Sequence, residues 1–83
     1  MIDIAELIQK IYNRAKAIGL SQCRVYLVPP YKGTALWHTA FSYPSRNNVG
    51  GNGGGFNSKF ANRLSPDEGL REILEVLNSP DFE

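Results

Sequence analysis

Apolar residues recur three or four positions apart along the first part of the chain. This series consists of Ile4, Ile8, Ile11, Ala15 and Ile18, with Leu7 and Tyr12 widening the stripe. The spacing places these side chains on one face of a helix. Asp3 followed by Glu6 is typical of a capping box, and Gly19 supplies a left-handed stop. The pattern therefore predicts a helix over 3–18.

Polar and apolar positions alternate along the next two segments, as they do in half-buried strands. The first segment, 22–28, ends at Pro29 and Pro30, which cannot donate to a ladder, and the second, 34–43, closes at Pro44. A hairpin connects them, because parallel pairing needs a much longer crossover. The larger apolar side chains share one face of each strand: Cys23, Val25 and Leu27 in the first, and Trp37, Phe41 and Tyr43 in the second.

The segment 56–64 fits two kinds of structure. Its large apolar residues are spaced by four, as on a helix, yet they also alternate with polar residues, as on a strand: Phe56, Phe60 and Leu64. A clear helix start follows at once at Ser65. That start favours a strand over 56–64, with the three apolar side chains pointing inward.

The last helix has its own start and stop signals. Ser65 is an N-cap residue, Pro66 suits the first helical position, and Glu68 completes a capping box. One apolar stripe follows: Leu70, Ile73, Leu74 and Leu77. Asn-Ser-Pro at 78–80 ends the helix, and we interpret 79–83 as a tail.

Together these elements predict one small α+β domain over 1–83, in the order α-β-β-β-α. The three-stranded antiparallel sheet carries both helices on one face, because a sheet this small can be covered on only one side. The uncovered face then receives the side chains that alternate with the apolar ones: Arg24, Tyr26 and Val28, then Leu36, His38, Ala40 and Ser42, then Asn57, Lys59 and Arg63.

The segment 45–55 is rich in glycine and asparagine and forms no regular structure in this prediction, because glycine loses the most backbone entropy on ordering. Three interpretations are open: a flexible hairpin loop, a loop that wraps an anion or a partner, and a nucleotide-binding P-loop. A P-loop needs Gly-Lys-Ser/Thr before a helix. Here Gly55 is followed by Phe-Asn-Ser-Lys, which disfavours the third.

Charge adds a second pattern to this outline. The net charge of the 83 residues is only +1, but the signs are segregated. Residues 1–6 carry two acids and no base, residues 7–66 carry eight bases and no acid, and residues 67–83 carry six acids and one base. Asymmetry of this kind indicates an anionic partner for the basic span.

Composition excludes several classes of protein. The single cysteine, Cys23, rules out a disulfide framework and a cysteine-based metal site, and fits a reducing compartment. No apolar run reaches the ~20 residues of a membrane helix, and no signal peptide is visible. We therefore expect a cytoplasmic protein without membrane contact, metal or cofactor.

His38 is the one candidate for acid–base catalysis, because its unperturbed pKa is the only one near neutrality. No carboxylate lies between Glu6 and Asp67, so that an acid–base pair would need a partner from a helix. Cys23, if it faces inward, acts as a small hydrophobic residue. These observations favour a non-enzymatic role over an RNA-cleaving role for His38.

Three stretches of the chain carry a resemblance to known families: Lys-Gly-Thr at 32–34, His-Thr-Ala-Phe-Ser-Tyr-Pro at 38–44 and Gly-Leu-Arg-Glu-Ile-Leu at 69–74. In topology, residues 3–77 resemble the double-stranded-RNA-binding domain and the smaller HicA-type mRNA-interferase toxins. The resemblance implies the α-β-β-β-α fold, RNA as a partner and, in the toxins, a histidine that cleaves RNA.

The leading hypothesis is a small non-enzymatic binding module. It recognises an anionic partner (RNA, a nucleotide or an acidic protein surface) through the open sheet face and the glycine-rich loop. The expected binding residues are Arg24, Tyr26, His38, Arg46, Asn57, Lys59 and Arg63. The alternative is a self-associating protein, such as a homodimer, or an inhibitor or adaptor that acts by protein contact. A HicA-like ribonuclease using His38 is the third hypothesis.

Overall fold

The computed structural model describes residues 3–44 and 55–82. Its elements follow one another as α1 (Ile4–Ala17), β1 (Arg24–Val28), β2 (Trp37–Pro44), β3 (Phe56–Arg63) and α2 (Pro66–Leu77). The predicted α-β-β-β-α order is confirmed, and the ambiguous segment after the glycine-rich stretch is a strand. Arg46 and all but the last residue of the glycine-rich loop lie outside the described residues.

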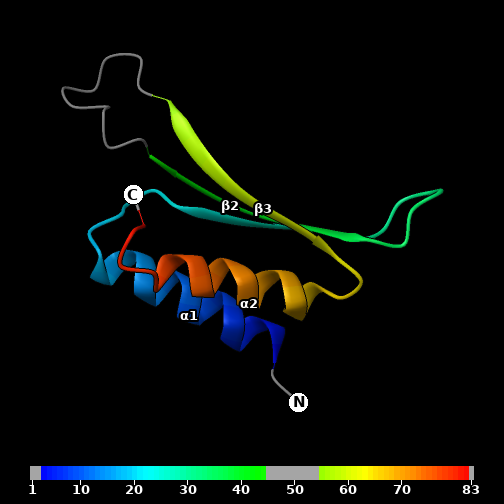
Figure 1. Ribbon diagram of the computed structural model, residues 1–83, viewed down its shortest axis with the longest axis horizontal. Helices are drawn as coiled ribbons and strands as arrows, with labels where there is room; N and C mark the ends of the chain where they lie inside the picture. Colours follow the sequence, from blue (N-terminus) through cyan, green and yellow to red (C-terminus); the bar gives the residue numbers. More distant parts are fainter. Residues whose placement is uncertain (1–2, 45–54, 83) are drawn as a thin grey trace.

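The molecule has two layers. The strands form one antiparallel sheet in the order β1-β2-β3, and both helices lie on the same side of it (Figure 1). Fully buried side chains from both helices and the central strand fill the space between the layers: Leu7, Ile11, Ala15, Phe41, Tyr43, Leu70, Ile73 and Leu77. No helix of the described residues covers the opposite side of the sheet, as the sequence predicts.

The helix ends follow from local signals. Asp3 caps α1, and its Oδ1 accepts a hydrogen bond from the backbone N–H of Ala5 at 3.2 Å. Gly19 follows α1 with φ of +86°, the left-handed backbone that glycine adopts without strain. Ser65 is the N-cap of α2 and Pro66 its first residue, but the Ser65 side chain makes no capping hydrogen bond. The predicted capping box is therefore wrong at this helix.

The connection between β1 and β2, residues 29–36, projects beyond the helices (Figure 1). A turn closes it, in which the N–H of Thr34 donates to the carbonyl of Tyr31 at 3.0 Å and Gly33 adopts φ of +86°. All eight residues of the connection are exposed. The second strand starts at Trp37 rather than at 34, so Leu36 belongs to this connection and not to the open face.

The predicted orientation of β3 is wrong. Antiparallel pairing places Lys59 opposite the buried Phe41 and Ala61 opposite the buried Thr39, so these β3 residues face the helices. Phe60, paired with Ala40, points to the uncovered side and is 65% exposed. Because side chains alternate along a strand, a shift of one residue exchanges the two faces.

Close packing of α2 against the sheet explains this orientation. A Cβ atom on Gly69 would lie 2.1 Å from Oγ1 of Thr39, so α2 nearly touches β2 at this point. The β3 neighbour of Thr39 must therefore be small, and it is Ala61. With Ala61 inside, the alternation forces Phe60 outside.

No helix in the described part of the chain is both long enough and apolar enough to cross a membrane.

Candidate functional site

The uncovered side of the sheet, called the open face below, is the candidate site. By strand alternation and register it consists of Arg24, Tyr26 and Val28 of β1, His38, Ala40, Ser42 and Pro44 of β2, and Phe56, Ser58, Phe60 and Asn62 of β3. Nothing among the described helices covers it (Figure 1). The set includes three aromatic rings, one histidine, one arginine and no carboxylate.

Two aromatic side chains flank an alanine across the middle of the open face. Tyr26 and Phe60 both pair with Ala40, one from each neighbouring strand. Tyr26 is 47% exposed and Phe60 is 65% exposed, whereas Ala40 is buried between them. Since neighbouring strands lie about 4.8 Å apart, the two ring-bearing residues are separated by roughly 10 Å of sheet. Exposed rings at this spacing offer flat surfaces on which planar groups can stack.

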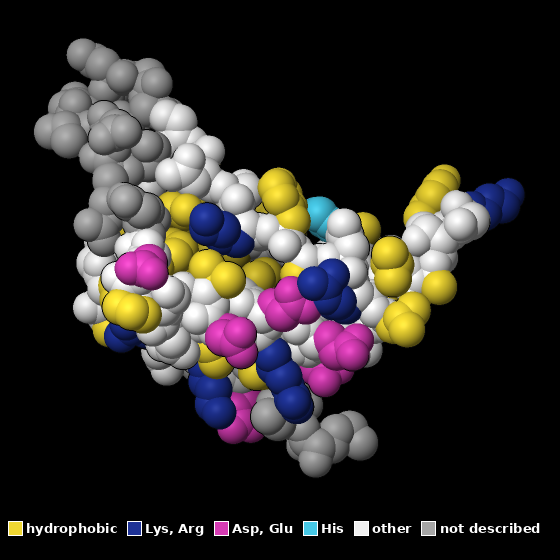
Figure 2. Space-filling model, in the orientation of Figure 1, with side chains coloured by type: hydrophobic (Ala, Val, Ile, Leu, Met, Phe, Trp, Pro, Cys, Tyr) yellow, Lys and Arg dark blue, Asp and Glu magenta, His cyan; other side chains and the backbone are white. Residues whose placement is uncertain are grey.

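His38 lies beside Phe60 and is held in place by the next strand. Its Nδ1–H donates to Oδ1 of Asn62 at 2.7 Å, and its ring centroid lies 5.5 Å from that of Phe60. This bond leaves Nε2 as the nitrogen that can meet a ligand. Figure 2 shows the histidine at the floor of a hollow between the projecting connection and the rest of the sheet.

Arg24 stands at the other end of β1, where an open cavity of about 480 Å³ borders the open face. The cavity is lined by Tyr12, Gln22, Cys23, Arg24 and Phe56. Burial raises the pKa of the Cys23 thiol, so this side chain keeps its proton at neutral pH. Arg24 is thus the charged group that the cavity offers to an anion.

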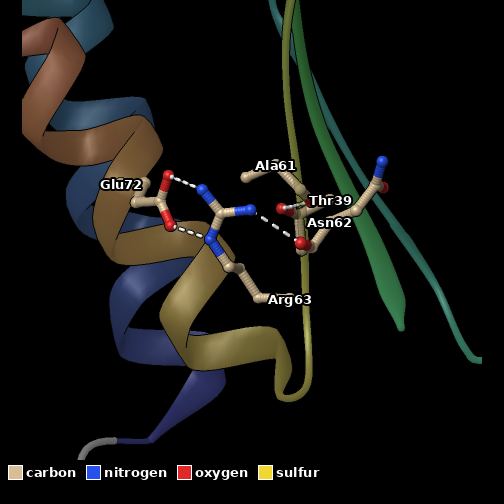
Figure 3. Close-up of polar contacts among 5 residues, drawn as sticks. All are labelled: Thr39, Ala61, Asn62, Arg63 and Glu72. Carbon is tan, nitrogen blue, oxygen red and sulfur yellow. Dashed lines mark hydrogen bonds and ion pairs between the residues drawn. The ribbon is translucent and has the colours of Figure 1, made fainter. Parts of the chain in front are cut away.

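Three of the predicted binding residues lie on the helix-covered side and not on the open face: Asn57, Lys59 and Arg63. Arg63 forms a bidentate ion pair with Glu72 of α2, and its Nη1 also donates to the carbonyl of Asn62 at 2.7 Å (Figure 3). The Lys59 ammonium lies 5.9 Å from the ring centroid of Phe82. The predicted placement of these three residues on the open face is therefore wrong.

This change alters the character of the site. The only permanent charge on the open face is Arg24, and the described carboxylates belong to the helices, to the N-cap of α1 and to the tail. The prediction of a basic face is replaced by an aromatic, nearly uncharged face. The predicted placement of Arg24, Tyr26 and His38 on it is confirmed.

The sequence interpretation missed all four β3 members of the open face: Phe56, Ser58, Phe60 and Asn62. The large apolar side chain of Phe60 is typical of a core residue. The signal that points the other way is Gly69, a glycine inside an amphipathic helix, which indicates close approach of another element. That close approach requires Ala61 inside and so places both of its neighbours outside.

The described residues gather no group of three or more histidine, cysteine, aspartate or glutamate side chains that could hold a metal ion.

Comparison with known proteins adds no relative, since no family model, curated protein or solved structure matches the chain.

Proposed function

We propose that this chain is a small non-enzymatic binding module whose open face recognises an anionic partner, and that the partner is a single-stranded nucleic acid, with RNA as the first choice. The observation that carries the proposal is the open face itself. It joins the exposed rings of Tyr26 and Phe60 to His38 and Arg24 and contains no carboxylate. The contribution of the glycine-rich loop rests on the sequence alone.

Unpaired bases suit this face better than a duplex does. Proteins bind single strands by stacking bases on aromatic side chains of an open sheet, whereas a duplex hides its bases and presents phosphates. Tyr26 and Phe60 supply the stacking surface, and Arg24 supplies a phosphate contact. With so few cations on the open face, phosphate attraction alone does not support tight duplex binding.

The direct test is a fluorescence anisotropy titration with a labelled single-stranded RNA and with the same RNA annealed to its complement. We expect the single strand to bind more tightly than the duplex. Tyr26→Ala should weaken single-strand binding about tenfold, because stacking contributes ~1–3 kcal/mol per base. Tyr26→Phe keeps the ring and should bind as the parent does. Equal binding of duplex and single strand, or no effect of Tyr26→Ala, would refute the proposal.

Salt dependence measures the charged part of the contact. The logarithm of the affinity should fall only gently with the logarithm of salt concentration, because each phosphate neutralised by a single-strand binder contributes a slope of about −0.7. Arg24→Gln should make that slope shallower by about 0.7. An unchanged slope would remove Arg24 from the interface.

A second candidate function, contact with another protein, has one specific observation in its favour. Tyr26, Val28, Phe56 and Phe60 are each about half exposed or more on a single face. Exposed apolar side chains gathered in one patch often mark a protein interface. If the open face binds no nucleic acid while Val28→Glu abolishes capture of a protein partner, this second function holds.

The ribonuclease hypothesis stays a prediction. The structure gives His38 an orienting amide in Asn62, but the open face offers no carboxylate as its acid–base partner. His38→Ala should leave any cleavage of RNA by the purified chain unchanged.

A further inference from the structure

We infer that the outer edge of β3 pairs with the same edge of a second copy of this chain, joining two sheets into one of six strands. This inference goes beyond nucleic-acid binding and does not depend on it. It rests on the difference between the two edges of the sheet.

The edge at β1 is short and partly closed. β1 has five residues, and the backbone N–H of Val25 donates to the hydroxyl of Tyr12 on α1 at 3.0 Å. This N–H points away from β2, toward the side where another strand would pair. Because it already donates to Tyr12, it is not free to bond to a partner strand. β3 is longer, with eight residues, and forms the other edge.

The Val25 bond also fixes which backbone groups of β3 point outward. In an antiparallel sheet, successive residues direct their N–H and C=O groups to opposite edges. The backbone N–H of Val25 points away from β2. When this alternation is followed through the pairing of β1 with β2 and of β2 with β3, the β3 residues whose backbone groups point away from β2 are Phe56, Ser58, Phe60 and Asn62.

Among the outward backbone groups of these residues, only one has a hydrogen-bond partner within 3–44 and 55–82. The carbonyl of Asn62 accepts from the Arg63 side chain. The backbone groups of Ser58 and Phe60 have none in those ranges. An open edge of this length is a template for another strand.

Large apolar side chains gather along the same edge. Phe56 and Phe60 are 56% and 65% exposed, Leu64 directly after β3 is 70% exposed, and Val76 of α2 is 38% exposed. Figure 2, which looks onto β3 and α2, shows hydrophobic side chains at the surface between them. A shallow pocket of about 100 Å³ lies there, lined by Lys59, Phe60, Ala61, Glu72, Ile73 and Val76.

A second copy fits this edge because β3 is complementary to itself in one register. With a two-fold axis at Ser58, the outward groups of Phe56, Ser58 and Phe60 face those of Phe60, Ser58 and Phe56 in the other copy. Each Phe60 then lies opposite a Phe56, a favourable cross-strand aromatic pair. The axis places Lys59 opposite Asn57.

The neighbouring registers are less favourable. An axis at Lys59 sets two ammonium groups opposite each other, which is destabilising. An axis at Phe60 places Ser58 opposite Asn62, whose carbonyl already accepts from Arg63. The register centred on Ser58 avoids both problems, and it leaves the two open faces side by side on one surface.

Disulfide trapping tests the register directly. In the proposed pair the two Ser58 residues are direct neighbours, with Cα atoms about 5.5 Å apart, within disulfide reach. In a Cys23→Ser background, Ser58→Cys should form a covalent dimer under mild oxidation on a non-reducing gel. The matched control is Asn62→Cys, on the same strand and face, whose two copies would lie far apart. Equal crosslinking of both variants, or of neither, overturns the inference.

A second measurement does not depend on cysteine chemistry. Sedimentation velocity should show a dimer for the parent chain and a monomer for Ser58→Pro, because proline removes the outward N–H while the bonds to β2 stay. Ser58→Thr keeps the N–H and should remain a dimer. If Ser58→Pro fails to fold by circular dichroism, Val76→Glu replaces it, with loss of the dimer expected. A monomeric parent, or dimeric edge variants, contradicts the pairing.

Val28→Glu separates this edge contact from a face-to-face dimer. Val28 lies on the open face, at the far side of the sheet from β3. The Val28→Glu variant should therefore still form the edge dimer. Dissociation by Val28→Glu with survival of the Ser58→Pro dimer would place self-association on the open face and overturn the edge inference.

Discussion

Small residues of α2, β2 and β3 meet in one close contact, and this contact accounts for the orientation of β3. Thr39 is fully buried, its hydroxyl donates to the carbonyl of Ala61 at 2.8 Å, and the backbone of Gly69 lies directly against it (Figure 3 shows the hydroxyl bond). A Cβ atom at Gly69 would clash with the Thr39 side chain, which would have to shift. This close approach of α2 puts Ala61 inside and Phe60 on the open face.

The first prediction tests this contact. Gly69→Ala should lower the free energy of unfolding by about 1–3 kcal/mol, since an added Cβ overpacks the interface with Thr39. The measurement is urea unfolding followed by circular dichroism. Gly55→Ala is the matched control, because nothing lies within 4 Å of a Cβ built there. If both variants unfold alike, the contact does not constrain α2.

At the scale of elements, the helices and strands were predictable and the orientation of one strand was not. The spacing of apolar residues predicts α1 and α2, because each helix has a continuous apolar stripe and clear start and stop residues. β1 and β2 are oriented correctly, since their inward residues are the larger apolar ones. These are local properties of sequence, and they need no knowledge of the partner element.

The orientation of β3 depends on non-local packing. Its inward side faces α2 at the sheet edge, where polar side chains find partners: the Lys59 ammonium lies over the ring of Phe82, and Arg63 pairs with Glu72. A long connection such as 45–55 does not set hairpin register, whereas a two-residue turn does. The apolar pattern of Phe56, Phe60 and Leu64 therefore indicated the wrong face.

The ion pair between β3 and α2 gives a prediction at this scale. Arg63 and Glu72 are each about half exposed, so their coupling should be at most about 1 kcal/mol. A double-mutant cycle of Arg63→Ala and Glu72→Ala, read by urea unfolding, measures it. Neither change should alter RNA affinity, because both side chains lie outside the open face. A loss of affinity in Arg63→Ala comparable with that in Tyr26→Ala would return Arg63 to the interface.

At the scale of the whole molecule, the segregated charge has a different meaning from the one the sequence suggests. The span 7–66 has no carboxylate, but folding directs several of its cations to the helical side. Lys59 and Arg63 meet Phe82 and Glu72 there. The open face therefore lacks negative charge, but it carries little positive charge, since Arg24 is its one charged residue. A surface of this kind favours stacking over phosphate attraction.

Two adjacent residues of β3 test most directly whether the open face is the functional surface. Phe60 points to the open face and Lys59 to the helices. The measurement is the dissociation constant for labelled single-stranded RNA, by anisotropy, of Phe60→Ala and Lys59→Ala. We predict that Phe60→Ala weakens binding about tenfold or more, because a stacking ring is lost, and that Lys59→Ala binds nearly as the parent does. Loss of binding in Lys59→Ala with retention in Phe60→Ala would contradict the claim.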